Sequence, residues 1–177
     1  MWEEKTVKRE TIFKGRIVQL NVDTVLLPDG RESTREIVKH KEAVAVVALD
    51  EKGNIYMVRQ YRKPVEKVLL EIPAGILNDE DEEPLEAAKR ELREETGLIA
   101  ASWEKLASFY TAPGFTDEKI HLFLATRLSQ GTQRLDEDEF VEVEVISLAR
   151  AYEMVLKGEI KDAKSIIGIQ WARLQIG

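Results

Sequence analysis

The order of the expected elements predicts an α+β or layered α/β/α domain with a mixed sheet, preceded by a small antiparallel β unit. Three observations predict it. Strand-like segments stand on both sides of one helical segment that ends near Gly97. The apolar run at residues 43–49 suits a buried central strand. Two helical segments close the chain, beginning at Ser147 and near Asp162.

Residues 5–40 form the expected N-terminal unit. They are rich in β-branched residues with partial alternation, which is typical of strands. Residues 28–30 read Pro-Asp-Gly and mark a turn, because proline sets φ and glycine accepts a positive φ. So small a sheet is marginal alone, and we expect it to pack on its own domain or on a second subunit. We therefore divide the chain into a β meander at 1–40 and a main domain at 41–177.

The main domain is expected to continue as strands, one helix and more strands. A short strand at 69–72 leads into the sequence Pro-Ala-Gly, and the segment at 140–146 alternates like a half-exposed strand. Further strands are expected at 54–61, 102–110 and 119–127. Ser147 is a good N-cap for the next helix. The last helix is expected to place these apolar residues on one face: Ala163, Ile166, Ile167, Trp171 and Leu174.

The helix before Gly97 carries the most informative pattern. Glu91, Glu94 and Glu95 lie on one helical face, where like charges destabilise a helix by about 0.2–0.5 kcal/mol per pair. A hard divalent cation reverses that penalty, since magnesium prefers carboxylate oxygens together with substrate phosphates. A solvated acidic face produces the same spacing. Pro84 at the start and Gly97 at the end give the helix clear limits.

Residues 75–98 resemble a Nudix box, the signature of hydrolases that cleave a nucleoside diphosphate linked to another group. Residues 90–98, RELREETGL, fit the pattern throughout, and seven residues separate Glu82 from Arg90 as it requires. Six residues rather than five separate Gly75 from Glu82, which we interpret as one extra loop residue. The resemblance implies an α/β/α sandwich with a mixed sheet and the box helix packed on it.

The metal site implied by the resemblance begins with Glu91 and Glu95. The main-chain carbonyl of Ala74 is the further ligand, and Gly75 lets backbone and ligand approach closely. Glu94 is expected to bind another ion or a water of the metal site. Arg90 is expected to be structural, paired with Glu94 at i+4.

A second acidic cluster, residues 136–139, resembles the mobile acidic loop of the ADP-ribose pyrophosphatases. By that resemblance Glu137 is the base that accepts a proton from the attacking water, and Glu139 completes the metal site. A solvated turn would have the same composition. Pro113, sixteen residues beyond Gly97, resembles the ADP-ribose-specific branch. In that branch the residue matching Glu118 contacts a ribose hydroxyl.

Four further residues are candidates for substrate binding. Arg59 and Arg62 stand at a strand end before the box, and the guanidinium fork matches phosphate oxygens. Solvated strand-end charges are the alternative interpretation. Glu71 resembles a family position near the substrate, and Arg35 is a further candidate.

Composition narrows the partners. The 177 residues carry a net charge of −7, which argues against nucleic acid but not against a nucleotide bound through metal ions. The chain has no cysteine, so disulfides and thiolate metal sites are excluded. With no signal-like or membrane-length apolar run, we expect a cytoplasmic protein without a membrane partner.

The expected function is hydrolysis of the diphosphate of ADP-ribose to AMP and ribose 5-phosphate. The cofactor is Mg²⁺, with Mn²⁺ able to substitute, and the protein is a homodimer whose meander helps to bind the nucleoside. GDP-mannose or another nucleotide sugar is the alternative substrate. A non-catalytic module that senses ADP-ribose or regulates a partner is the other alternative.

Overall fold

The computed structural model describes residues 2–78, 81–135 and 140–176. Contacts divide the chain into two units, Met1–Glu42 with Phe109–Lys119, and Ala43–Ser108 with Ile120–Gly177. Within the described residues, no helix combines the length and apolarity needed to cross a membrane.

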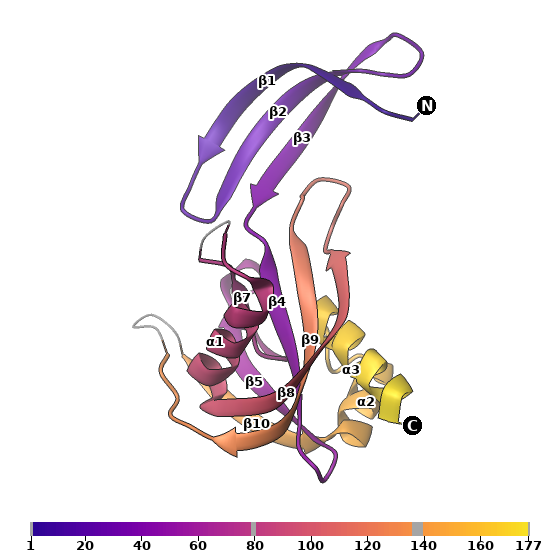
Figure 1. Cartoon of the computed structure of the whole chain (residues 1–177). Coiled ribbons are helices and arrows are strands. Elements are labelled where there is room, and N and C mark those ends of the chain that lie inside the picture. Colours follow the sequence, from indigo (N-terminus) through magenta and orange to yellow (C-terminus); the bar gives the residue numbers. More distant parts are fainter. Residues whose placement is uncertain (1, 79–80, 136–139, 177) are drawn as a thin grey trace. The chain divides into compact units, whose positions relative to one another are not determined.

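The first unit is a three-stranded antiparallel sheet in the order β1-β2-β3 (Figure 1). Its strands are β1 (Lys5–Lys14), β2 (Val18–Leu26) and β3 (Glu32–His40). All ten residues of β1 are exposed, whereas Asp23 of β2 is 1% exposed and held by Arg9. Residues 109–119 join this unit, since the amide of Val38 donates to the carbonyl of Phe115 at 2.8 Å.

The second unit contains a seven-stranded sheet with the path β10-β5-β4-β9-β8, on which β6 pairs with β5 and β7 with β4. The pairing of β4 with β9 is parallel, whereas those of β5 with β4 and β10 are antiparallel, so the expected mixed sheet is confirmed. The strands are β4 (Ala43–Leu49), β5 (Asn54–Arg62), β6 (Lys67–Glu71), β7 (Ala74–Ile76), β8 (Leu98–Tyr110), β9 (Lys119–Gln130) and β10 (Val141–Ser147).

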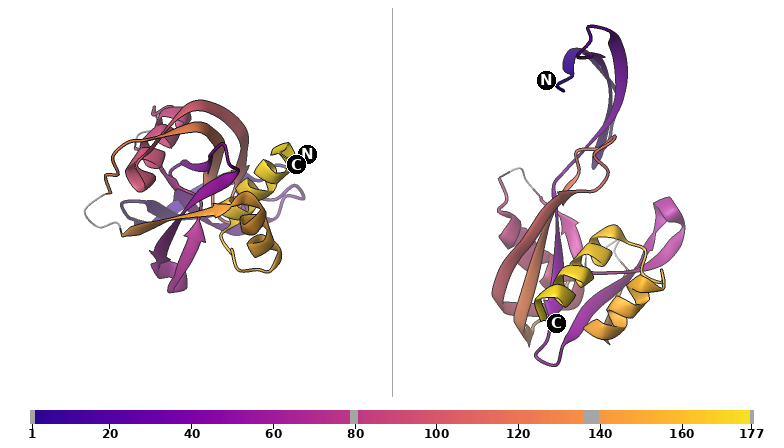
Figure 2. Two further views of the ribbon diagram at one scale, coloured as in Figure 1. Left: turned by 90° about the horizontal axis from the view of Figure 1, so that it is seen from below. Right: turned by 90° about the vertical axis from the view of Figure 1, so that its right-hand side faces the viewer.

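Helices cover both faces of this sheet, with α1 on one side and α2 and α3 on the other (Figure 2). Their bounds are α1 (Pro84–Thr96), α2 (Leu148–Leu156) and α3 (Ala163–Ile176), with a 3₁₀ turn η1 at Lys63–Val65. All of β4 is buried, because its side chains alternate between the two helical layers. Val44 and Val46 pack in one cluster with Ala88 and Leu92 of α1. The layered α/β/α fold is therefore confirmed.

The limits expected for the box helix are confirmed. Pro84 occupies the first turn, where its missing N–H costs nothing. Gly97 ends α1 in the left-handed conformation with φ 73°, and its amide donates to the carbonyl of Arg93. Strand β8 begins at Leu98, four residues before the expected start, because the Gly97 cap turns the chain directly into the sheet. The acidic helix is thus fixed at its C-terminal end by the strand that follows.

The apolar face expected for the last helix is wrong. Trp171 is 41% and Leu174 83% exposed, whereas Ile169 and Ala172 are fully buried. The reason is close packing on β4: a Cβ at Gly168 would lie 2.8 Å from Cγ2 of Val47. Gly168 therefore lies at the closest approach of the helix to the sheet, where no side chain fits without a shift.

Candidate functional site

Arg90 ties the box helix to the loop before it. Its NH1 donates to Oε1 of Glu91 at 2.6 Å and to Oε2 of Glu94 at 3.2 Å, which confirms the expected i+4 pair. Its Nε contacts Oε1 of Glu82 at 3.2 Å, and NH2 donates to the carbonyl of Ile76 at 3.1 Å. Burial lowers the pKa of the Arg90 guanidinium, but Glu82 and Glu91 outweigh it and raise that pKa further. Arg90 is therefore a permanent cation that holds three box carboxylates.

Glu91 and Glu95 reach the main chain at the start of β7. The carboxylate of Glu91 lies so close to Gly75 that an added Cβ there would come within 2.1 Å of its Cδ and Oε1. Oε2 of Glu95 accepts a hydrogen bond from the amide of Ala74 at 3.1 Å. Both glutamates are buried, at 9% and 2% exposure. Two carboxylates one helical turn apart thus converge on the Ala74–Gly75 peptide.

This donor set fits a hard divalent cation. Glu91, Glu95 and the carbonyl of Ala74 supply only oxygen ligands, and a side chain at Gly75 would collide with the carboxylate of Glu91. In residues 2–78, 81–135 and 140–176, however, no three carboxylate or imidazole groups already cluster closely enough to hold an ion. The carboxylates of Glu91 and Glu94 instead share Arg90. Their metal-binding role stays a prediction.

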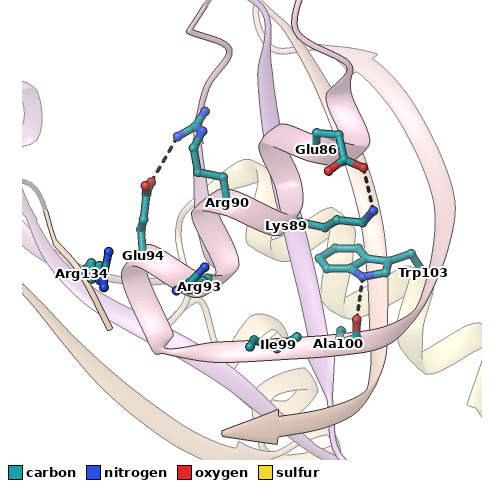
Figure 3. A pocket seen from close by; sticks show the side chains of 9 residues that line it. All are labelled: Glu86, Lys89, Arg90, Arg93, Glu94, Ile99, Ala100, Trp103 and Arg134. Atoms are coloured by element: carbon teal, nitrogen blue, oxygen red, sulfur yellow. Dashed lines mark hydrogen bonds and ion pairs between the residues drawn. The ribbon is translucent and has the colours of Figure 1, made fainter. Parts of the chain in front are cut away.

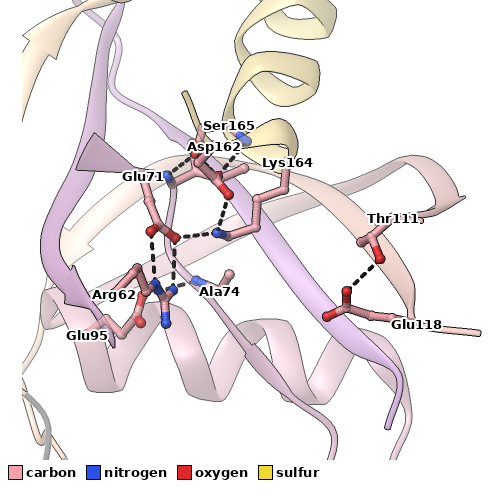
Figure 4. Close-up of polar contacts among 10 residues, drawn as sticks. Arg62, Glu71, Ala74, Glu95, Thr111, Glu118, Asp162, Lys164 and Ser165 are labelled. Carbon is pink, nitrogen blue, oxygen red and sulfur yellow. Dashed lines mark hydrogen bonds and ion pairs between the residues drawn. The ribbon is translucent and has the colours of Figure 1, made fainter. Parts of the chain in front are cut away.

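Arg62 and Glu71 form a bidentate pair next to this site (Figure 4). Nε and NH2 of Arg62 donate to the two oxygens of Glu71 at 2.9 and 2.8 Å. Glu71 is 1% exposed, whereas the side chain of Arg62 is 38% exposed. The hydrogen bond to Glu71 raises the pKa of Arg62. In this arrangement Glu71 holds the guanidinium of Arg62 while the Arg62 side chain stays partly exposed. A substrate contact of Arg62 stays a prediction.

Glu71 gives the fold a pH-dependent contribution. Burial by itself raises the pKa of Glu71, but Arg62 and Lys164 outweigh it and keep that pKa below its ordinary value of 4.5. A carboxyl whose pKa is lowered by folding contributes its full stabilisation to the folded state when the pH is above its ordinary pKa. That contribution is lost as the pH falls through the lowered pKa.

Accordingly, the free energy of unfolding of the wild type should exceed that of Glu71→Gln most at about pH 7, and the gap should narrow below about pH 4.5. Urea unfolding of both proteins between about pH 7 and about pH 3 checks this. A gap that stays constant over that range would contradict the role assigned to Glu71.

The structure separates the two candidate arginines of β5. Residues three apart on a strand leave it on opposite faces, so Arg59 and Arg62 point apart. Nε of Arg59 donates to Glu144 on the neighbouring strand β10. A substrate role for Arg59 stays a prediction, but the described contacts do not bring Arg59 into the Arg62–Glu71 pair.

Two candidates belong to the first unit. Arg35 pairs through Nε with Oε2 of Glu4 at 2.8 Å, and Glu118 accepts a hydrogen bond from Oγ1 of Thr111 at 2.6 Å. Nδ1 of His40 lies 3.7 Å from Oε1 of Glu118. The contacts of Arg35 and Glu118 with substrate stay predictions.

Glu137 and Glu139 lie outside the described residues, so their roles stay predictions. The segment before them is attached to the C-terminal end of α1. The amide of Gly131 donates to the carbonyl of Gly97 at 2.7 Å, and that of Arg134 to the carbonyl of Glu94 at 3.1 Å. Residues 131–134 are therefore held at the end of the helix that carries Glu94.

A cavity of about 430 Å³ lies along the solvent side of α1 (Figure 3). Lys89, Arg93, Trp103 and Arg134 line it together with Arg90 and Glu94. It includes neither Ala74 nor the buried pair Glu91 and Glu95. The cavity is thus a neighbouring surface rather than the place where the buried carboxylates meet.

Sequence reasoning missed the first turn of α3. Nζ of Lys164 donates to Oε2 of Glu71 and lies 3.0 Å from Oδ1 of Asp162. Oγ of Ser165 accepts a hydrogen bond from the amide of Ile72 at 2.8 Å. Asp162 was expected only as the start of the helix. Lysine and serine at a helix start are usually solvated, and nothing in the local sequence marks them as buried.

Two family models together match residues 4–167. The NUDIX domain matches residues 39–167, and the nucleoside diphosphate sugar hydrolase N-terminal domain matches residues 4–38.

Similar proteins cover almost the whole chain. An "ADP-ribose pyrophosphatase" of Bacillus subtilis (strain 168) is 50% identical over 98% of this chain and 94% of its own. A "Methanol dehydrogenase activator" of Bacillus methanolicus is 49% identical over 99% of this chain and 95% of its own. A solved structure described as an "ADP compounds hydrolase" superposes with a TM-score of 0.88 at 22% sequence identity. The match covers 98% of this chain and 94% of the other, and it supports the fold.

Proposed function

The chain belongs to the NUDIX domain family, and on that premise we propose that it hydrolyses ADP-ribose or a related nucleoside diphosphate sugar. Water and ADP-ribose would give AMP and ribose 5-phosphate. The observation that carries the proposal is the convergence of the buried Glu91 and Glu95 on the Ala74–Gly75 peptide. The name of the Bacillus subtilis relative supports the substrate class.

We propose Mg²⁺ as the cofactor, with Mn²⁺ able to substitute, held by Ala74, Glu91, Glu94, Glu95 and Glu139. When bound, the ion neutralises the diphosphate and lowers the pKa of the attacking water. The residues of the chain have separate tasks. Arg62 would bind a phosphate oxygen through the part of its guanidinium that Glu71 leaves open. Glu137 would accept the proton of the water. Arg35, Arg59 and Glu118 are the other proposed substrate contacts.

The assignment of Glu137 as the base gives a prediction about register. Glu137→Gln should turn over substrate at least about a hundredfold more slowly, because a positioned base contributes about 10²–10⁴ in rate. Mn²⁺ affinity of that variant should stay unchanged, whereas Glu139→Gln should bind Mn²⁺ more weakly. Steady-state rates and Mn²⁺ titration separate the two effects. If Glu137→Gln matches the wild type while Asp138→Asn is inactive, the assignment is off by one residue.

A panel of diphosphates tests the reaction itself. ADP-ribose, GDP-mannose and other nucleotide sugars would be incubated with Mg²⁺ or Mn²⁺, and the nucleotide and sugar phosphate products identified. Preferential release of AMP and ribose 5-phosphate from ADP-ribose supports the proposal. Preference for GDP-mannose would move the function to the alternative nucleotide sugar, and absence of any turnover would overturn it.

A second candidate is regulation of a partner protein. The Bacillus methanolicus relative is named for activating a dehydrogenase, and it is nearly as similar as the relative named as a pyrophosphatase. A regulatory module would bind ADP-ribose without metal-dependent turnover. Calorimetry with ADP-ribose, compared with the panel above, distinguishes the two functions.

We also propose a homodimer in which the N-terminal meander covers a second copy and helps to bind the nucleoside. The support is β1, whose residues are exposed throughout and include Val7, Ile12 and Phe13 at 53–58% exposure. A mass of one chain by light scattering would contradict it. The cytoplasmic location stays a prediction.

A further inference from the structure

The first turn of α3 contacts the strand that leads into the metal-binding peptide. Lys164 and Ser165 are 9% and 0% exposed, although both are polar. Asp162 organises them: its Oδ2 accepts from the amide of Ser165 at 3.0 Å, and its Oδ1 lies 3.0 Å from Nζ of Lys164. Lys164 in turn bonds Glu71 (Figure 4), and Ser165 bonds Ile72, each across ninety-three residues of sequence. The turn therefore belongs spatially to the site although it lies far from the box in sequence.

Lys164 belongs to a network of four charged side chains in which Glu71 and Lys164 itself are buried. The network contains two cations and two anions. Arg62 pairs with Glu71, Glu71 with Lys164, and Lys164 with Asp162. A buried charge without a partner is strongly unfavourable, so each member constrains the next. Because Lys164 fixes Glu71 and Glu71 fixes Arg62 in a bidentate pair, Lys164 determines where the guanidinium of Arg62 stands.

Ser165 acts on the main chain instead. Its Oγ accepts the amide hydrogen of Ile72 at 2.8 Å. The next two residues are held from other directions, because the carbonyl of Pro73 accepts from the amide of Val46 at 2.8 Å and the amide of Ala74 donates to Glu95 at 3.1 Å. The path of the chain into Ala74 is thus fixed at three consecutive residues, and Ser165 supplies one of the three bonds.

We propose that Lys164 and Ser165 are positioning residues with separate tasks: Lys164 orients Arg62 toward the substrate diphosphate, and Ser165 sets the carbonyl of Ala74 for the divalent cation. This inference rests on the proposed function. The inference adds to that function by assigning the orientation of Arg62 to Lys164 and the position of the Ala74 carbonyl to Ser165, two neighbouring residues of one helical turn.

Lys164→Met tests the first task. At saturating Mg²⁺ we expect KM for ADP-ribose to rise about tenfold, the cost of a misplaced charged hydrogen bond, with kcat and the Mn²⁺ dissociation constant within about twofold of wild type. Lys164→Arg, which keeps the charge, should restore most of the KM. Lys161→Met removes an exposed lysine three residues earlier and should leave all parameters unchanged. If Lys164→Met does not fold, Lys164→Gln removes the charge but keeps a donor and should show the same KM rise.

Ser165→Ala tests the second task. We expect its Mn²⁺ dissociation constant, measured by electron paramagnetic resonance without substrate, to rise about tenfold, as for other residues that support metal ligands. KM at saturating metal should stay within about threefold. Ser129→Ala, at an exposed hydroxyl, is the matched control.

The split between the two variants decides the inference. If both variants fold and keep wild-type KM and Mn²⁺ affinity, or if each changes both parameters together, the inference is overturned. Failure of the proposed function gives a different result from failure of this inference. If the wild type hydrolyses no diphosphate, the Mn²⁺ measurement on Ser165→Ala still applies, and the affinity of Lys164→Met for inorganic pyrophosphate replaces KM.

Discussion

Replacing Glu95 by Gln is expected to lower kcat by at least about a hundredfold without unfolding the protein. A glutamine oxygen can still accept the amide hydrogen of Ala74, which Glu95 now bonds at 3.1 Å, so the local geometry is kept. What is lost is the negative charge that a divalent cation needs.

Glu86→Gln is the matched control for that experiment. Glu86 lies on the solvent side of the same helix, where it pairs with Lys89 at 2.7 Å. Its loss should leave kcat unchanged, because an exposed pair at i+3 contributes only about 0.3–0.5 kcal/mol. Turnover near the wild-type rate in Glu95→Gln would remove the metal assignment, and the same applies to Glu91→Gln.

Gly75→Ala is expected to disrupt the proposed metal site from its main-chain side. A Cβ at this position would lie 2.1 Å from Oε1 of Glu91, far inside contact distance. The flexible carboxylate must move away, so the fold should survive while the ligand set is broken. We expect Mn²⁺ affinity and kcat to fall by at least about tenfold each.

Gly114→Ala makes the same chemical change where no heavy atom lies within 4 Å of the added Cβ. It should behave as wild type in Mn²⁺ titration and steady-state kinetics. A Gly75→Ala variant that binds Mn²⁺ as tightly as the wild type would show that Glu91 is not a ligand in the position described.

Much of the fold could be predicted because its signals are local. The continuous apolar run at 43–49 became the fully buried strand β4, and Pro84 and Gly97 marked the ends of α1. The buried face of α3 was not predicted. Helical periodicity favours the face with the most apolar residues, but α3 approaches β4 so closely at Gly168 that a Cβ there would lie 2.8 Å from Val47, and the buried face instead includes Gly168, Ile169 and Ala172.

The candidate site was predictable where one helix carries it. The four-residue spacing of Glu91 and Glu95 placed both on one helical face. The structural role of Arg90 was predicted because Glu94 lies four residues after it, and the two side chains do pair. The separation of Arg59 from Arg62 also follows from strand alternation, and a stricter use of that rule would have predicted it. Lys164 could not be found, because its partner is ninety-three residues away and only the tertiary fold brings the two together.

Because the last helix holds Glu71 and Ile72, the Nudix-box segment is not expected to work when it is moved into another protein. Residues 75–98 grafted onto a foreign scaffold would bring the acidic helix with them. The rigid framework around its neighbouring peptide would stay behind, in residues 162–165. A transplant or a fragment library chosen by the signature alone should therefore yield inert proteins, and a minimal catalytic fragment of this chain must extend at least through the first turn of α3.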